Sequence, residues 1–184
     1  MNANATSSRE IILAALSKVD VLLRDKGVIG ELCIFNGAAM VLAFDARDST
    51  RDVDAIFVPK TTMLEAARKV GFDMGLRSDW LNDGVKGFVS NEGEVTSAGM
   101  PFFGNLRIMR PTAEYLLAMK CLASRLADHD HPGDQRDVIV LIKHLGITDP
   151  AIVCDLVIKY YKESLLPPKV RYFIEETMSE MKPS

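Results

Sequence analysis

The pattern of hydrophobic and polar positions predicts alternating helices and strands in the first part of the chain. Residues 9–24 carry apolar side chains on one helical stripe, and Ser7 or Ser8 is placed to cap that helix. Short apolar runs bounded by glycines, prolines or polar turns are typical of buried strands. Three such runs occur, at residues 31–35, 53–58 and 105–109.

The segments between these strands predict further helices and short strands. Residues 38–44 follow a turn at Gly37 as a helix of small and apolar residues. Residues 61–70 are predicted to be helical, with one of the first two threonines as the N-cap. The stretch up to residue 104 is rich in Gly, Asn, Asp and Ser, and its strand candidates lie near residues 85–90 and 100–103.

After residue 110 the pattern is helical throughout. Helices are predicted at residues 112–127, 134–145 and 148–162, and a last one from the Pro167-Pro168 break to about residue 181. The predicted fold class is therefore α+β. Residues 9–110 would form a mixed sheet flanked by helices, and residues 111–184 a helical bundle packed on it.

Composition excludes some classes of function. The chain has 184 residues and a net charge of −3, so no strong overall field would draw it to DNA, although a local basic patch around an RNA end is compatible. No apolar run approaches membrane-spanning length, and residues 1–10 are polar. Cys33, Cys121 and Cys154 lie in apolar stretches, which indicates reduced, buried thiols. We therefore expect a cytoplasmic protein with no membrane partner.

Two aspartates at the start of a predicted strand are the first candidates for chemistry. In an extended chain Asp52 and Asp54 lie on the same face, where their charges repel unless a cation sits between them. Upstream, Gly37 ends one strand and begins a helix whose N–H groups can face an anion. The simpler alternative is that the two aspartates are the solvated start of a strand.

This order of elements resembles the nucleotidyltransferase fold of DNA polymerase β type, and in particular its small bacterial branch that includes AbiEii-type toxins. The family signature is a hydrophobic residue, Gly, then Gly or Ser, and after about a dozen residues Asp-hydrophobic-Asp/Glu. Here Gly37-Ala38 and Asp52-Val53-Asp54 occupy those places, and Ser49-Thr50-Arg51 before the acids is also similar. The resemblance implies a nucleotidyltransferase-like mixed sheet.

The second half adds to the resemblance. Lys120 on one predicted helix, then Arg125, then Asp134 and Asp137 on the next helix are similar to the Lys…Arg…Asp pattern of these relatives. The resemblance covers about residues 30–145. Without it, Lys120 is a half-buried lysine with a solvated tip, and the others form a surface ion-pair set.

The sequence departs from the family at two places. Ala38 replaces a Gly or Ser of the turn, or Asn36 does if the pair is read one place earlier. Polymerase-type members usually carry a third carboxylate on a later strand, but residues 105–109 contain none and carry Arg107. Asp79 and Asp83, in the loop region before that strand, are the remaining acidic candidates.

The resemblance implies roles for these residues. Asp52 and Asp54 would hold Mg²⁺ and act in catalysis with Lys120 and Asp137. The nucleotide would be bound by the remaining candidates, which are Asn36, Gly37, Ala38, Thr50, Arg51 and Arg125. Arg51 is equally well explained as a solvated neighbour of the acids. The tract Asp128-His129-Asp130-His131 looks like a metal site but lies in a polar helix connection, without Cys at ligand spacing.

Three functions are compatible with these features. The first is Mg²⁺-dependent transfer of an NMP from an NTP to a hydroxyl on RNA, protein or a small molecule, as the toxin of a toxin–antitoxin or phage-defence system with an antitoxin partner. The second is a catalytically silent member that binds nucleotide or a protein partner. The third is an interaction module in which the acidic pair is only a solvated strand edge.

Overall fold

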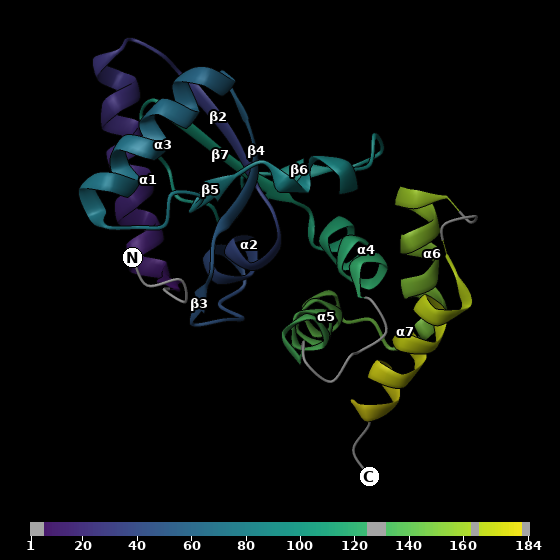
Figure 1. Ribbon diagram of the computed structural model, residues 1–184. Helices are drawn as coiled ribbons and strands as arrows, with labels where there is room; N and C mark the ends of the chain where they lie inside the picture. Colours follow the sequence, from purple (N-terminus) through teal and green to yellow (C-terminus); the bar gives the residue numbers. More distant parts are fainter. Residues whose placement is uncertain (1–5, 125–131, 163–165, 182–184) are drawn as a thin grey trace. The chain divides into compact units, whose positions relative to one another are not determined.

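The protein has an α+β fold, as its sequence predicts (Figure 1). The computed structural model describes residues 6–124, 132–162 and 166–181. These residues form seven α-helices, a five-stranded mixed sheet and a two-stranded sheet. No helix among them is both long enough and apolar enough to cross a bilayer. The chain divides into two compact units, Met1–Gly87 with Val95–Arg110, and Phe88–Glu94 with Pro111–Ser184.

The first unit holds both sheets. Its elements are β1 (Ser7–Ser8), α1 (Arg9–Asp25), β2 (Gly30–Ile34), α2 (Asn36–Ala43), β3 (Ser49–Thr50), β4 (Val53–Val58), α3 (Lys60–Met74), β5 (Leu81–Asn82), the 3₁₀ helix η1 (Gly84–Phe88), β6 (Val95–Thr96) and β7 (Leu106–Pro111). The last residue of η1 and the last of β7 belong to the second unit.

The five-stranded sheet has the order β5-β4-β2-β7-β6. Strand β2 runs antiparallel to β4 and parallel to β7, with Cys33 opposite Ile56 on one side and Met109 on the other. Strand β5 runs parallel to β4, so that Asn82 lies beside Asp54. In the two-stranded sheet, β1 pairs with β3 and brings Ser7 opposite Thr50.

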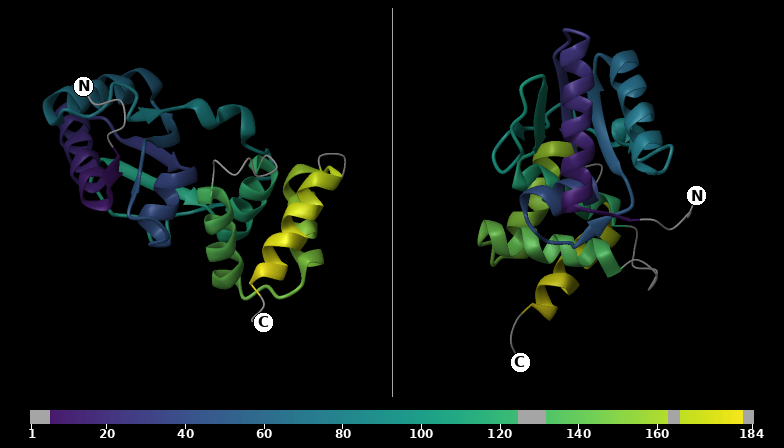
Figure 2. Two further views of the ribbon diagram at one scale, coloured as in Figure 1. Left: turned by 60° about the horizontal axis from the view of Figure 1, so that its bottom comes forward. Right: turned by 90° about the vertical axis from the view of Figure 1, so that its left-hand side faces the viewer.

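The two faces of the main sheet differ in burial. One face carries the buried residues Leu32, Ile34, Val53, Ala55 and Phe57. Helices α1 and α3, which lie side by side (Figure 2), cover it, because a Cβ on Gly30 would meet Leu23 of α1 and Met63 of α3. The opposite face is only half-buried, and it is the face to which Asp54 belongs.

The second unit is a bundle of four helices, α4 (Ala113–Ala123), α5 (Pro132–Leu145), α6 (Pro150–Tyr161) and α7 (Pro168–Glu180). Helix α4 packs against the other three, which explains why most of its residues are buried. Its N-cap is Thr112, whose side chain accepts a hydrogen bond from Tyr115 N, as the sequence predicts.

The segment Phe88–Glu94 also belongs to the helical unit, although the sequence pattern predicts it as part of the α/β region. Ser90 N donates to Tyr115 Oη at 2.7 Å, and Tyr160 Oη donates to Glu94 at 2.8 Å. Gly93 lies so close to the Tyr115 ring that a Cβ there would overlap it. The segment therefore belongs to the helical unit because of long-range contacts with two tyrosines of the bundle, and no local sequence pattern indicates these contacts.

Several local predictions are wrong. Helix α3 begins directly after Pro59, and its N-cap has no side-chain hydrogen bond, so neither threonine caps it. The strand predicted at 85–90 is the 3₁₀ helix η1, which begins and continues with glycines that weaken a strand. Residues 100–103 form no strand, and Phe102 is 95% exposed.

Candidate functional site

Asp52 and Asp54 lie at the start of β4 on the half-buried side of the main sheet. Both side chains are half-buried. Asn36 Nδ2 donates a hydrogen bond to Asp54 Oδ2 at 2.9 Å, which joins the acidic strand to the first residue of α2. Asn36 has φ of +49°, a left-handed conformation that Asn tolerates better than most residues. The backbone thus turns sharply at the point where its side chain reaches Asp54.

Gly37 and Thr50 connect the same helix to Asp52. The Thr50 side chain lies directly against Gly37, where an added Cβ would be 3.2 Å from Thr50 Cβ and closer still to Oγ1. Thr50 Oγ1 also donates a hydrogen bond to the carbonyl of Asp52 at 3.2 Å. Thr50 is buried, so the residues packed around it hold its side chain in this position. Only glycine fits at position 37 without displacing Thr50.

The N-terminus of α2 is directed by these two connections toward the acidic pair. Asn36, Gly37 and Ala38 form the first turn of α2, whose N–H groups have no partner within the helix. The N-cap, Phe35, supplies no side-chain hydrogen bond to them. The Ala38 side chain is buried, so this residue offers only its backbone. Such a helix start favours a negatively charged ligand.

The charges around Asp52 act on it in both directions. Burial raises the pKa of Asp52 above its usual range, and the carboxylates of Asp54 and Asp79 raise it further. The guanidinium groups of Arg51 and Arg77 act against this rise. Arg51 itself is exposed. A carboxylate pair with this character gains stability when a cation binds to it.

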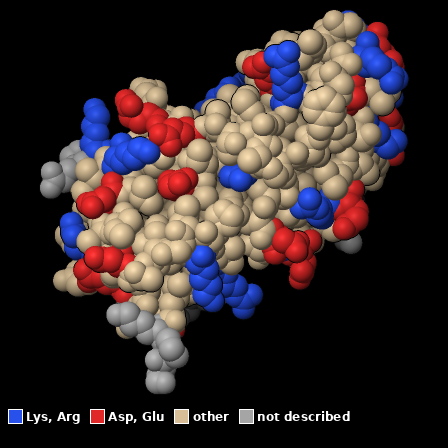
Figure 3. Space-filling view, turned by 180° about the vertical axis from the view of Figure 1, so that it is seen from behind, with Lys and Arg blue, Asp and Glu red and all other residues tan. Residues whose placement is uncertain are grey.

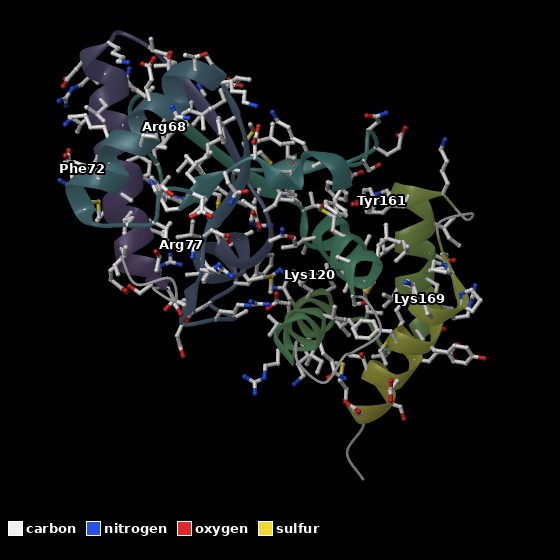
Figure 4. All side chains as sticks on the ribbon, viewed as in Figure 1. Arg68, Phe72, Arg77, Lys120, Tyr161 and Lys169 are labelled. Carbon is white, nitrogen blue, oxygen red and sulfur yellow. The ribbon has the colours of Figure 1, made fainter. Side chains whose placement is uncertain are left out.

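Arg77 and Asp79 lie near enough to the acids for their charges to act on Asp52. The sequence pattern indicated Asp79 as a candidate for the additional acid and assigned no role to Arg77. Arg77 Nε donates to Asp79 Oδ1 at 3.0 Å, and Nη2 donates to Oδ2 at 2.8 Å. Figure 4 labels Arg77 on the segment between α3 and β5. The Arg-x-Asp spacing was visible in the sequence, but nothing local indicated that this segment lies beside the start of β4.

The later strand β7 carries no carboxylate. It carries Arg107, which pairs with Glu31 at 3.2 Å, and Arg110, whose Nε donates to the carbonyl of Ala98 at 3.0 Å. Asp83 is held by Lys60 and Lys86, each at 2.7 Å. Asp79 is thus the additional carboxylate whose charge acts on Asp52.

The donor set at β4 fits Mg²⁺ bound together with a nucleotide. Mg²⁺ is usually held by one or two carboxylates, with water and substrate phosphates completing its shell. Asp52 and Asp54 provide two carboxylates on one face. Within residues 6–124, 132–162 and 166–181 no three His, Cys, Asp or Glu side chains gather as a possible metal site. Asp52 and Asp54 are thus the two carboxylates of this site that could hold such an ion together with a ligand.

Lys120 and Asp137 lie in the helical unit and bind each other. Lys120 Nζ is 2.8 Å from Asp137 Oδ2, and the two side chains are 7% and 0% exposed. The ion pair joins α4 to α5 (Figure 4 labels Lys120). Arg125, the tract Asp128-His129-Asp130-His131 and the side chain of Asp134 lie outside the described residues.

The surface view in Figure 3 shows small groups of acidic and basic side chains interspersed over the face that it presents. That face has no continuous field of one sign, in keeping with the net charge of −3.

No protein-family model, no curated protein and no solved structure matches this chain.

Proposed function

We propose that this protein is a Mg²⁺-dependent nucleotidyltransferase that moves an NMP from an NTP to a hydroxyl group. The observation that carries the proposal is the Asn36–Asp54 hydrogen bond, together with the Gly37–Thr50–Asp52 contacts. These contacts join an anion-favouring helix start to a pair of carboxylates. A nucleoside triphosphate bound to Mg²⁺ needs both features at one site.

The reaction is an in-line displacement at the α-phosphorus. The acceptor hydroxyl oxygen forms a bond to the α-phosphorus while the bond from that phosphorus to its bridging oxygen breaks. Pyrophosphate leaves with the electron pair, and the hydroxyl proton passes to solvent or to a carboxylate of the site. Mg²⁺ bound by Asp52 and Asp54 would neutralise charge on the triphosphate and on the departing pyrophosphate.

The remaining residues of the site orient the nucleotide in this proposal. The backbone N–H groups of Asn36, Gly37 and Ala38 bind phosphate oxygens at the start of α2. Thr50 fixes the position of Gly37 and of the Asp52 carbonyl. Arg51 contributes positive charge beside Asp52. The roles of Lys120, Arg125 and Asp137 that the family resemblance implies stay predictions.

We further propose that the protein acts in the cytoplasm, and that it is the toxin of a toxin–antitoxin or phage-defence pair. The support for the compartment is that Cys33, Cys121 and Cys154 are free thiols. The support for the biological role is the resemblance to the AbiEii-type branch alone. RNA, a protein or a small molecule would be the acceptor, and an antitoxin protein the partner.

A second candidate is a protein that binds nucleotide through the same residues without transferring it. The lack of a carboxylate on β7, from Leu106 to Pro111, favours it. Two carboxylates are enough to share a metal with a nucleotide. A missing third acid would remove a metal ligand or a base from the reaction and leave binding intact.

The test compares the wild-type protein with Asp52→Asn. Each protein is incubated with Mg²⁺, total RNA and one of the four α-labelled NTPs, and label transfer to macromolecules is measured. Asp48→Asn is the matched control, because Asp48 is an exposed carboxylate of the preceding loop. We expect transfer by wild type and by Asp48→Asn, and a loss of at least about 100-fold in Asp52→Asn.

Two other outcomes separate the alternatives. Binding of an NTP that requires Mg²⁺, with no transfer to RNA, to protein or to small-molecule acceptors, supports the silent protein. If no NTP binds at millimolar concentration, both candidates are wrong, and the acidic pair belongs to an interaction surface.

A further inference from the structure

The segment between α3 and β5 has a fixed conformation. It leaves α3 through Gly75, which has φ of +65°, and Leu76 N then donates to the carbonyl of Gly71 at 2.8 Å. Trp80 anchors its other end, because the indole is 3% exposed and donates from Nε1 to the carbonyl of Ala67 at 2.9 Å. Both ends of the segment are thus held on α3.

The same segment is attached to the strand that carries the acidic pair. Val53 N donates to the carbonyl of Trp80 at 2.6 Å. Strand β5 then continues parallel to β4, with Leu81 beside Val53 and Asn82 beside Asp54. The segment that carries Arg77 and Asp79 is therefore connected, through Trp80, to Val53, the residue that follows Asp52.

Arg77 is held by Asp79 in an orientation suited to binding an anion. The two parallel bonds, at 3.0 and 2.8 Å, fix the guanidinium plane and reduce the rotamer freedom that a long side chain loses on binding a ligand. The Arg77 side chain is 19% exposed and that of Asp79 is 53% exposed. Arg77 is thus largely sheltered from solvent, which strengthens the interaction of its charge with nearby groups.

A positive group is needed beside the acidic pair when a nucleotide binds. Phosphates brought to Asp52 and Asp54 add negative charge to a site that already holds two half-buried carboxylates. Arg77 is one of the two arginines whose guanidinium charge acts on Asp52. Arg51, the other arginine, is exposed, and its side chain makes no hydrogen bond or ion pair with the described residues. An oriented guanidinium binds phosphate oxygens in a bidentate manner, which an ammonium group cannot do.

We propose that Arg77 is a nucleotide-binding residue that contacts phosphate oxygens at the Asp52–Asp54 site, and that Asp79 is the positioning residue that holds its guanidinium. The proposal rests on the proposed function, because it needs a nucleotide at the acidic pair. The alternative is that the Arg77–Asp79 pair only braces its loop, as exposed ion pairs often do, with a contribution of about 0–1 kcal/mol.

The experiment measures the dissociation constants of Mg²⁺ complexes of the four NTPs and of inorganic tripolyphosphate by calorimetry. The variants are Arg77→Ala, Arg77→Lys and Asp79→Asn. Arg68→Ala is the matched control, because Arg68 is an exposed arginine of α3 (labelled in Figure 4). Melting temperatures, read in parallel, show that each variant is folded.

We expect Arg77→Ala to weaken binding of the nucleotide about 10- to 100-fold, the usual effect of losing charge-assisted hydrogen bonds. Binding of tripolyphosphate should weaken by a similar factor, because the contacts that are lost are contacts with phosphate. The affinity of Arg77→Lys should lie between those of wild type and Arg77→Ala. Asp79→Asn should weaken binding less than Arg77→Ala does, and Arg68→Ala should bind as tightly as wild type. If Arg77→Ala does not fold, Arg77→Lys and Asp79→Asn carry the test.

Three results would overturn the proposal. Arg77→Ala and Arg77→Lys that both bind within twofold of wild type, while Asp52→Asn loses binding, would leave the proposed function intact and remove Arg77 from it. Weaker nucleotide binding with unchanged tripolyphosphate binding would assign Arg77 to the base or the sugar. A wild-type protein that binds neither ligand would contradict this proposal and the proposed function together.

Discussion

The acidic pair on β4 and the ion pair between α4 and α5 place charges in opposite situations. Asp52 and Asp54 carry like charges and are half-buried on one sheet face. Lys120 and Asp137 carry opposite charges, lie 2.8 Å apart and are nearly inaccessible to solvent. The first pair is destabilised by its own repulsion, whereas each member of the second pair compensates the charge of the other.

This difference separates residues suited to bind a ligand from residues that stabilise the fold. A ligand that brings a cation relieves the repulsion between Asp52 and Asp54. A ligand that binds Lys120 would have to replace Asp137, a buried carboxylate that would then lose the counter-charge supplied by Lys120. Substitutions at three positions test this comparison, from the largest expected effect to the smallest.

Lys120→Ala should destabilise the protein strongly. It removes the counter-charge that Lys120 supplies to the buried Asp137 carboxylate, and removing one partner of a buried ion pair typically costs about 3–5 kcal/mol in the free energy of unfolding. Urea unfolding measures this loss. Lys159→Ala is the control, because Lys159 forms an exposed ion pair with Glu94 at 3.0 Å in the same unit and should cost about 1 kcal/mol at most.

The double variant Lys120→Met/Asp137→Leu should recover most of that loss, since apolar side chains of similar size often replace a buried ion pair without cost. If Lys120→Ala costs no more than Lys159→Ala, the buried pair does not stabilise the bundle. The comparison between the two charged pairs would then fail.

Gly37→Ala should disturb the acidic site without unfolding the unit. The new Cβ would lie 3.2 Å from Thr50 Cβ, and Thr50 is buried and hydrogen-bonded to Asp52. Overpacking of this kind costs about 1–3 kcal/mol, from which the better helix propensity of Ala recovers up to about 1 kcal/mol. Chemical unfolding and Mg²⁺-NTP binding should both show a loss.

Gly104→Ala is the control for that change, because a Cβ at Gly104 meets nothing within 4 Å. Adding Thr50→Ala to Gly37→Ala removes Thr50 Oγ1, the atom closest to the new Cβ, and should restore part of the stability. An unchanged stability in Gly37→Ala would show that the Thr50 contact is not tight.

Asp52→Asn should raise the melting temperature in metal-free buffer at neutral pH, by less than Lys120→Ala lowers it. The folded state raises the pKa of Asp52, so the folded protein holds this proton more tightly than the unfolded chain does. Stability is therefore lost as the pH rises from the ordinary Asp value of about 3.9 through the higher pKa of the folded state. Asparagine does not ionise, so Asp52→Asn removes this loss of stability.

The gain should consequently vanish below about pH 4, where Asp52 is protonated in both states. Differential scanning fluorimetry with EDTA across this pH range measures it, with Asp48→Asn as the exposed control. A lower melting temperature for Asp52→Asn at pH 7 would mean that the carboxylate makes favourable contacts that outweigh the repulsion.

Local patterns were sufficient for most of the fold. A helix cap at Ser7 or Ser8 and the strand at 53–58 follow from residue types and alternation. Both predictions are confirmed, with Ser8 as the cap. The stretch between β5 and β7 was not predictable in the same way. Its glycines permit several conformations, and the contacts of Ser90 and Gly93 with Tyr115 decide among them.

In the candidate site, too, some features follow from local sequence patterns and others depend on tertiary contacts. The sequence by itself predicted that Asp52 and Asp54 share a face, because the side-chain period of a strand is two, and that a helix follows the turn at Gly37, although this helix begins two residues earlier than predicted, at Asn36. Only the tertiary structure decided that Asn36 binds Asp54, that Thr50 fills the space left by Gly37, and that the segment with Arg77 and Asp79 is attached to the start of β4. The reason is that these contacts depend on which strands pair and in which register, and pairing is set by the burial of the whole sheet.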